Sequence, residues 1–126
     1  MEKNKVPRIL VVDDEATIRT VIRRWLEQAG YEVSDASNGQ QAMAMFSNCA
    51  SDLIICDMFM AEMDGIEMIQ KLKRVDPKVK VLAISGGGSL GHLEMLEVGK
   101  LLGANETLSK PFDMSKLLMS VQQMLA

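Results

Sequence analysis

The chain has 126 residues, 48% hydrophobic and 25% charged, which is the composition of one globular domain and excludes a disordered or fibrous protein. The net charge of -3 gives no electrostatic reason to expect a nucleic acid or an anionic membrane as a partner. Two cysteines are too few for a disulfide framework, the first residues contain no apolar signal core, and no apolar run approaches the ~20 residues that span a bilayer, so we expect a cytoplasmic protein.

Short apolar runs alternate with longer stretches of helical spacing along the chain. The apolar runs predict five strands, with the sequences RILVV (8–12), YEVSDA (31–36), DLIIC (52–56), VKVLAIS (79–85) and ETLS (106–109). The first and third are almost continuously apolar, as strands buried on both faces are, whereas the second is more polar and suits the edge of a sheet.

The stretches between and after these strands predict five helices. The first has apolar residues on one face from Ile18 to Ala29, Val21 among them, and stops at Gly30. The others begin, in chain order, at Ser37 or Asn38, at the capping box of residues 64–67, near Ser89 (ending at about Leu102) and near Asp113. Strands that alternate with helices predict an α/β fold, a doubly wound (βα)5 unit whose five-stranded parallel sheet is covered on both faces.

Polar side chains follow the predicted strands at the edge where their carboxyl ends meet. They are Asp13 and Asp14 after the first strand, Asp57 after the third, Ser85 at the end of the fourth, and Lys110 with Pro111 after the fifth. Ligands of open α/β sheets bind outside the carboxyl ends of the strands, so we expect these groups to converge on one site.

Each of these residues also has an ordinary structural explanation when it is taken alone. An aspartate after a strand can cap the next helix, a serine before glycines is common in turns, and Lys110-Pro111 can be a solvated lysine before a helix-starting proline. These explanations are independent of one another, whereas a shared site accounts for all of the residues together. The joint occurrence therefore favours a functional site.

The residue types at this edge suit the transfer of a phosphoryl group. Three carboxylates in one cleft need a cation, and all-oxygen ligands favour a hard divalent ion, with Mg²⁺ the best fit. An aspartate can form a covalent aspartyl phosphate. Lys110 can place positive charge on the phosphoryl oxygens, and Ser85 can donate a hydrogen bond to them.

Four segments, VVDDE, DLIICDMFMAEMDG, VLAISG and LSKPF, resemble the receiver domain of two-component response regulators, in the single-domain form typified by the chemotaxis regulator. The resemblance extends from about Arg8 to Ala126, so we expect one receiver domain over residues 1–126. It implies a flavodoxin-like sheet with strand order 2-1-3-4-5.

The resemblance also assigns roles to individual residues. Asp57 is the expected phosphoacceptor. Mg²⁺ is expected to contact Asp14, Asp57 and the backbone carbonyl of Phe59 directly, and Asp13 through water. Ser85 and Lys110 are expected to contact the phosphoryl group, and the bond between Lys110 and Pro111 is expected to be cis.

Three features depart from the family pattern. Thr107 occupies the switch position, three residues before Lys110, where the family usually has Tyr or Phe; Ala61 replaces a usual proline; and the loop over residues 85–94 is longer than in the chemotaxis type. Because Thr107 is small and stiff at χ1, we expect the signal to be read through the fourth helix and the glycines at 86–88.

These observations predict a phosphoacceptor signalling switch and not an enzyme with an external substrate, although the protein takes part in its own phosphotransfer and dephosphorylation. The expected phosphodonor is a histidine kinase or a histidine phosphotransfer protein. The expected output is a change in the surface of the fourth helix, fifth strand and fifth helix, which controls a downstream protein without direct contact to nucleic acid or membrane. Since no output domain follows Ala126, the signal is expected to leave by protein contact, unless the chain is one domain of a longer protein.

Two other classes of function fit part of the pattern. A phosphohydrolase with an aspartate nucleophile usually has a second acid two residues later, where this chain has Phe59, and turnover of a phosphomonoester would identify it. A flavin- or nucleotide-binding module could use GGGSLG (86–91), but this loop lacks the ending of a P-loop; retained flavin or nucleotide would identify that class.

Overall fold

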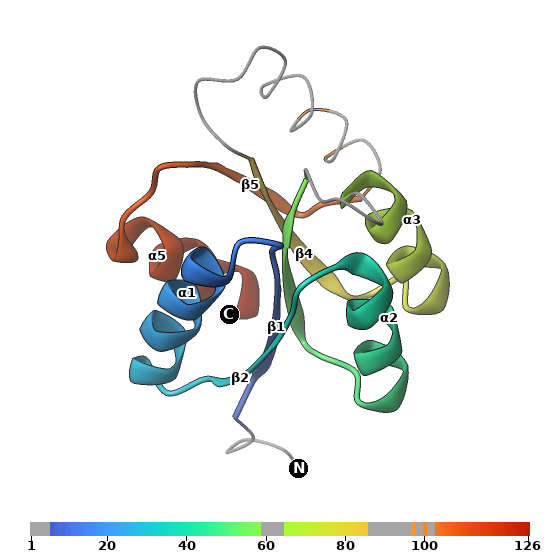
Figure 1. Cartoon of the computed structure of the whole chain (residues 1–126), viewed down its shortest axis with the longest axis horizontal. Helices are drawn as coiled ribbons and strands as arrows, with labels where there is room; N and C mark the ends of the chain where they lie inside the picture. Colours follow the sequence, from blue (N-terminus) through green and yellow to red (C-terminus); the bar gives the residue numbers. More distant parts are fainter. Residues whose placement is uncertain (1–5, 59–64, 86–96, 98–99, 101–102) are drawn as a thin grey trace.

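A sheet of five parallel strands, in the order β2-β1-β3-β4-β5, runs through the centre of the fold (Figure 1). The computed structural model describes residues 6–58, 65–85, 97, 100 and 103–126. The strands within these ranges are β1 (Arg8–Val12), β2 (Glu32–Ala36), β3 (Leu53–Asp57), β4 (Lys80–Ser85) and β5 (Glu106–Ser109). The predicted fold class and strand order are therefore confirmed, and YEVSDA supplies the edge strand β2.

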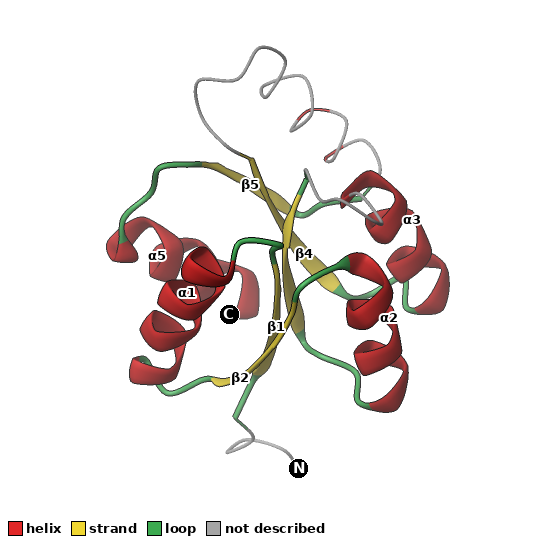
Figure 2. Cartoon of the chain, viewed as in Figure 1, coloured by secondary structure: helices red, strands yellow, loops and turns green. Residues whose placement is uncertain are grey.

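Helices lie on both faces of this sheet (Figure 2). They are α1 (Ala16–Gln28), α2 (Gly39–Asn48), α3 (Gly65–Val75) and α5 (Met114–Leu125). Helices α1 and α5 pack on one face, and α2 and α3 on the other (Figure 1). The predicted fourth helix, from about Ser89 to Leu102, lies outside the continuously described residues.

The central strands divide their side chains between two cores. In β1, Ile9 and Val11 belong to the core under α1 and α5, whereas Leu10 and Val12 belong to the core under α2 and α3. This alternation follows from the period of two in a strand, and it explains why both central strands are continuously apolar. Burial of each such side chain contributes roughly 1.5–3 kcal/mol.

The helix ends confirm the local signals that the sequence contains. Asn38 caps α2 by accepting a hydrogen bond from the Gln41 amide at 2.8 Å, and Asp113 caps α5 by accepting one from the Lys116 amide at 2.9 Å. Gly30 follows α1 with a φ of 98°, a conformation that favours glycine. The predicted capping residue Asp64 lies outside the described residues.

The apolar face predicted for α1 is wider than the face that is buried. Ile22 and Leu26 are fully buried, but Val21 is 37% exposed and Ala29 is exposed. The reason is that the sheet and α5 contact only part of the apolar stripe. None of the described helices has both the length and the apolar character that crossing a membrane requires.

Candidate functional site

Three carboxylates from two neighbouring strands meet at the carboxyl edge of the sheet. Asp13 and Asp14 follow β1, and Asp57 is the last residue of β3, one position further into the sheet than predicted. One ligand oxygen from each of the three lies within 4.8 Å of the other two. The structure thus brings together the acidic residues that the sequence places after separate strands.

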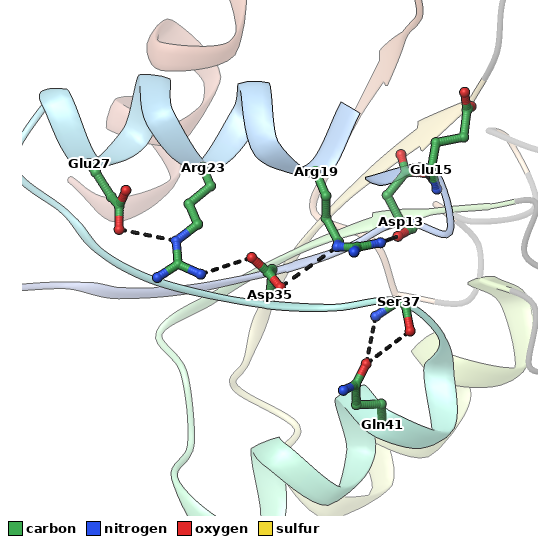
Figure 3. A network of polar contacts seen from close by, with 8 residues as sticks. All are labelled: Asp13, Glu15, Arg19, Arg23, Glu27, Asp35, Ser37 and Gln41. Carbon is green, nitrogen blue, oxygen red and sulfur yellow. Dashed lines mark hydrogen bonds and ion pairs between the residues drawn. The ribbon is translucent and has the colours of Figure 1, made fainter. Parts of the chain in front are cut away.

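The two adjacent aspartates have different surroundings. The Asp14 side chain is exposed, whereas Asp13 is completely buried. Asp13 Oδ1 accepts a hydrogen bond from the Glu15 amide at 2.9 Å, and Oδ2 accepts one from Lys110 Nζ at 3.1 Å. The Asp13 backbone carbonyl accepts a third from Arg19 Nη1 at 2.8 Å (Figure 3). A cation beside one carboxylate and water around the other relieve the repulsion of two neighbouring charges.

Asp57 is buried, with 4% of its surface exposed. Its Oδ2 lies 3.3 Å from Lys110 Nζ. The preceding residue, Cys56, is a buried cysteine outside any disulfide, and it belongs to the core under α2 and α3. Successive strand side chains point to opposite faces, so Cys56 belongs to the core, while Asp57 faces the acidic site.

Lys110, which follows β5, forms ion pairs with the acidic residues of the site. Its ammonium lies between Asp13 and Asp57 and is also 3.7 Å from Glu15 Oε1. Burial by itself lowers the pKa of Lys110, but the charges of Asp57 and Asp13 outweigh burial, and the pKa is raised above its ordinary value. The peptide bond from Lys110 to Pro111 is cis. Lys110 is therefore a fixed positive charge at the site near neutral pH.

Ser85 supplies a hydroxyl at the end of β4. The residue is completely buried, and its Oγ has no hydrogen-bond partner among the described residues. A buried hydroxyl without a partner costs about 1–3 kcal/mol, so native proteins usually keep such a group for a ligand or a water. Ser85 is thus available to a group that binds at this edge.

The donor set fits a hard divalent cation. Three carboxylates converge, and carboxylate oxygens with water are the ligands that Mg²⁺ prefers. The predicted backbone ligand, the carbonyl of Phe59, lies outside the described residues, as do Ala61 and the glycines at 86–88. Thr107 is half-buried in β5, opposite Ala83 of β4.

Three residues near the site were not singled out in the sequence. Glu15 binds Asp13 through its amide, Arg19 binds the Asp13 carbonyl, and Asp35 of β2 lies 3.7 Å from Arg19 Nε. The sequence holds a weak signal for Arg19, which is a basic residue in the first turn of a helix that follows three acidic residues. It holds none for Asp35, because its place beside α1 depends on the pairing of β2 with β1.

The chain is similar to known proteins over nearly its whole length. The model of the response regulator receiver domain matches residues 9–122. Sporulation initiation phosphotransferase F of Bacillus subtilis is 33% identical over 118 residues, which cover 94% of this chain and 93% of that protein. The transcriptional regulatory protein ZraR of Klebsiella oxytoca is 38% identical over 119 residues, which cover 94% of this chain but 26% of ZraR.

A solved structure gives the same result. The chemotaxis protein CheY4 of Vibrio cholerae matches with a TM-score of 0.85 and 31% identity, over 94% of this chain and 98% of that one. Family model, sequence relatives and solved structure agree over nearly the whole chain, and the protein is therefore a member of the response regulator receiver domain family.

Proposed function

We propose that this receiver domain, residues 1–126, is a phosphoacceptor switch in which Asp57 receives a phosphoryl group from the histidine of a kinase or phosphotransfer protein. The observation that carries the proposal is the set of three carboxylates within 4.8 Å, with the Lys110 ammonium 3.3 Å from Asp57. This arrangement supports attack by Asp57 while other groups of the site neutralise the charge of the incoming phosphoryl group.

The chain's own residues have distinct roles in this transfer. An Asp57 oxygen attacks phosphorus, the P–N bond to the donor histidine breaks, and the imidazole nitrogen keeps the electron pair. Lys110 pairs with the phosphoryl oxygens, and the Ser85 hydroxyl donates a hydrogen bond to them, which would satisfy a group that has no described partner. The product carries roughly one more negative charge than the free carboxylate.

Mg²⁺ is the proposed cofactor. Asp14 and Asp57 would bind it directly, together with the Phe59 carbonyl, and Asp13 would bind it through water, because Lys110 and the Glu15 amide already occupy Asp13. When bound, the ion supplies positive charge that screens the carboxylates from the phosphoryl oxygens.

The proposed output is a change in the surface that contains the fourth helix, β5 and α5. Met114 and Met119 of α5 are 40% and 58% exposed, and methionines on a surface suit adaptable contact with a partner protein. We expect control of a protein partner, without direct binding of nucleic acid or membrane.

The protein takes part in its own phosphotransfer and dephosphorylation and is a signalling protein, not an enzyme with an external substrate. We propose the cytoplasm as the compartment, where cysteines such as Cys49 and Cys56 stay reduced.

Intact-mass analysis tests the proposal. Parent protein is incubated with Mg²⁺ and a small acyl phosphate, and we expect the mass of one added phosphoryl group. Asp57→Asn and Asp14→Ala should take up none, and a chelator should abolish uptake by the parent. The matched control is Asp52→Asn, which makes the same change from carboxylate to carboxamide at an exposed position before β3, and it should behave like the parent. Uptake by Asp57→Asn equal to that of the parent would refute the assignment.

A further inference from the structure

A chain of ion pairs runs along α1 and ends on the backbone of the acidic site (Figure 3). Glu27 Oε2 is 3.1 Å from Arg23 Nε, and Arg23 Nη1 is 2.9 Å from Asp35 Oδ2. The other oxygen of Asp35 is 3.7 Å from Arg19 Nε, and Arg19 Nη1 donates to the Asp13 carbonyl at 2.8 Å. Two carboxylates and two guanidinium groups thus connect the edge strand β2 to the turn after β1.

Arg19 is the member of this chain that contacts the site. Its side chain is 19% exposed, compared with 42% for Arg23, so it is the more shielded of the two guanidinium groups. A guanidinium is a planar fork that can bind two acceptors at once, here the Asp35 carboxylate and the Asp13 carbonyl. Asp35 in turn is held by Arg23. The Asp35 carboxylate therefore orients the Arg19 side chain, and Arg19 in turn orients the Asp13 carbonyl.

Within the part of the chain that the structure describes, no backbone amide donates a hydrogen bond to the Asp13 carbonyl, so this carbonyl needs another partner. The pairing of β1 with β3 ends at Val12 and Cys56, and the Asp13 amide still donates to the Ala36 carbonyl of β2 at 3.2 Å. The Asp13 carbonyl belongs to the peptide group that leads into Asp14. The orientation of this carbonyl therefore fixes the plane of the peptide group, and with it the position of Asp14 and its carboxylate.

We propose that Arg19, oriented by Asp35, is a positioning residue that fixes the Asp13–Asp14 peptide group so that both carboxylates face one divalent cation. The Asp13 carboxylate is already held by the Glu15 amide and Lys110, so the hydrogen bond from Arg19 fixes the remaining acceptor of this residue. Groups that orient metal ligands without touching the metal typically change its affinity 10–100-fold. This inference rests on the proposed function, because the cation is the Mg²⁺ that phosphorylation of Asp57 requires.

The first test is the dissociation constant of Mg²⁺, measured by isothermal titration calorimetry without any phosphodonor. We expect Arg19→Gln to weaken binding about tenfold, the lower end of the range for such groups. Arg19→Lys keeps the charge but loses the fork, so it should lie between the parent and Arg19→Gln. Arg24→Gln, the same change at an exposed position of the same helix, is the matched control and should bind like the parent.

The second test asks whether Asp35 acts through Arg19. Asp35→Asn alone should weaken Mg²⁺ binding by a smaller factor than Arg19→Gln. The double variant should bind no more weakly than Arg19→Gln, because residues that act through one contact are not additive. Amide exchange at Glu15, whose N–H donates to Asp13, should become faster in Arg19→Gln and stay unchanged in Arg24→Gln.

Several outcomes would overturn the inference. If Arg19→Gln lowers the urea midpoint but binds Mg²⁺ like the parent, the ion pairs only stabilise the fold. Additive losses in the double variant would show that Asp35 acts by another route. If Arg19→Gln does not fold, unchanged affinity in both Arg19→Lys and Asp35→Asn refutes the role. If the parent protein binds Mg²⁺ and takes up phosphate while the variants give one of these results, only the role of Arg19 is refuted. If the parent protein neither binds Mg²⁺ nor takes up phosphate, the proposed function is refuted as well.

Discussion

Gly65 has no side chain, and this allows the start of α3 to lie close to the end of β3, where Asp57 is. A Cβ at this position would lie 2.6 Å from the Met58 Cα and 2.8 Å from the Asp57 carbonyl oxygen, both of them backbone atoms. Gly65→Ala must therefore push α3 away from the end of β3. We expect a loss of about 1–3 kcal/mol in the free energy of unfolding, measured with urea, and slower phosphorylation of Asp57.

Gly30→Ala is the control for this prediction. Gly30 has a φ of 98° but nothing within 4 Å of an added Cβ, so the substitution strains the backbone far from the site. It should cost about 1–2 kcal/mol and leave the phosphorylation rate unchanged. Equal rates for parent and Gly65→Ala would show that the close approach of α3 has no influence on Asp57.

Lys110 allows a test of the electrostatics of the site without a phosphodonor. Lys110→Met removes the ammonium that lies between Asp13 and Asp57. Two like unit charges ~4 Å apart repel each other by roughly 4 kcal/mol at an effective dielectric near 20. The Lys110 side chain is flexible and can reduce its repulsion of a bound Mg²⁺ by moving away. We therefore expect Mg²⁺ to bind Lys110→Met at least severalfold more tightly than the parent, as measured by calorimetry. Weaker binding would mean that Lys110 helps to place the metal ligands.

The same substitution predicts a pH dependence. The pKa of Lys110 is raised in the folded protein from the ordinary value of 10.5, so the folded state holds this proton more tightly than the unfolded state. The stability that the ammonium contributes is complete below 10.5 and is lost as the pH rises through the folded pKa. The difference in unfolding free energy between parent and Lys110→Met should therefore stay constant near neutral pH and shrink in alkaline urea titrations.

At the scale of elements, the beginning of α5 connects the site to the proposed output surface. Asp113 caps this helix three residues after Lys110, through a hydrogen bond of 2.9 Å from the Lys116 amide. Asp113→Ala should cost about 1 kcal/mol of stability, and Asp113→Ser should restore most of it, as measured by thermal unfolding. If alanine and serine behave alike, the cap does not stabilise α5.

At the scale of the whole molecule, the site exists only when the sheet is formed. Asp13 and Asp14 are separated from Asp57 by more than forty positions in the chain, and only the pairing of β1 with β3 brings them together. Mg²⁺ should therefore bind the folded state alone and raise the melting temperature. At a concentration ten times its dissociation constant the stabilisation should be about 1.4 kcal/mol.

Removal of the metal checks this expectation. A chelator should return the melting temperature to its value without Mg²⁺, and Asp14→Ala should show little response to the ion. A sodium salt at the same ionic strength, which requires a higher molar concentration than the Mg²⁺ salt, is the matched control and should have a much smaller effect. A rise in melting temperature that Asp14→Ala shares in full would place the ion elsewhere on the protein.

Much of the fold can be predicted from the sequence because its signals are local. The period of two in β1, the caps at Asn38 and Asp113, and the stop at Gly30 depend on residues within a few positions of each other. The convergence of polar side chains also follows, since all parallel strands end at one edge. The apolar stripe of α1 shows the limit, because the spacing that includes Val21 does not reveal how much of the stripe its neighbours cover.

The sequence by itself determined the alternation of strands and helices and the set of side chains at the carboxyl edge. Only the tertiary structure decided that Asp13 is buried and Asp14 exposed, that Lys110 lies between Asp13 and Asp57, and that Arg19 reaches the Asp13 carbonyl. The physical reason is range: backbone periodicity and capping act between near neighbours in the chain. Lys110 and Asp13, by contrast, are 97 positions apart, and the contact between them depends on the packing of the whole sheet.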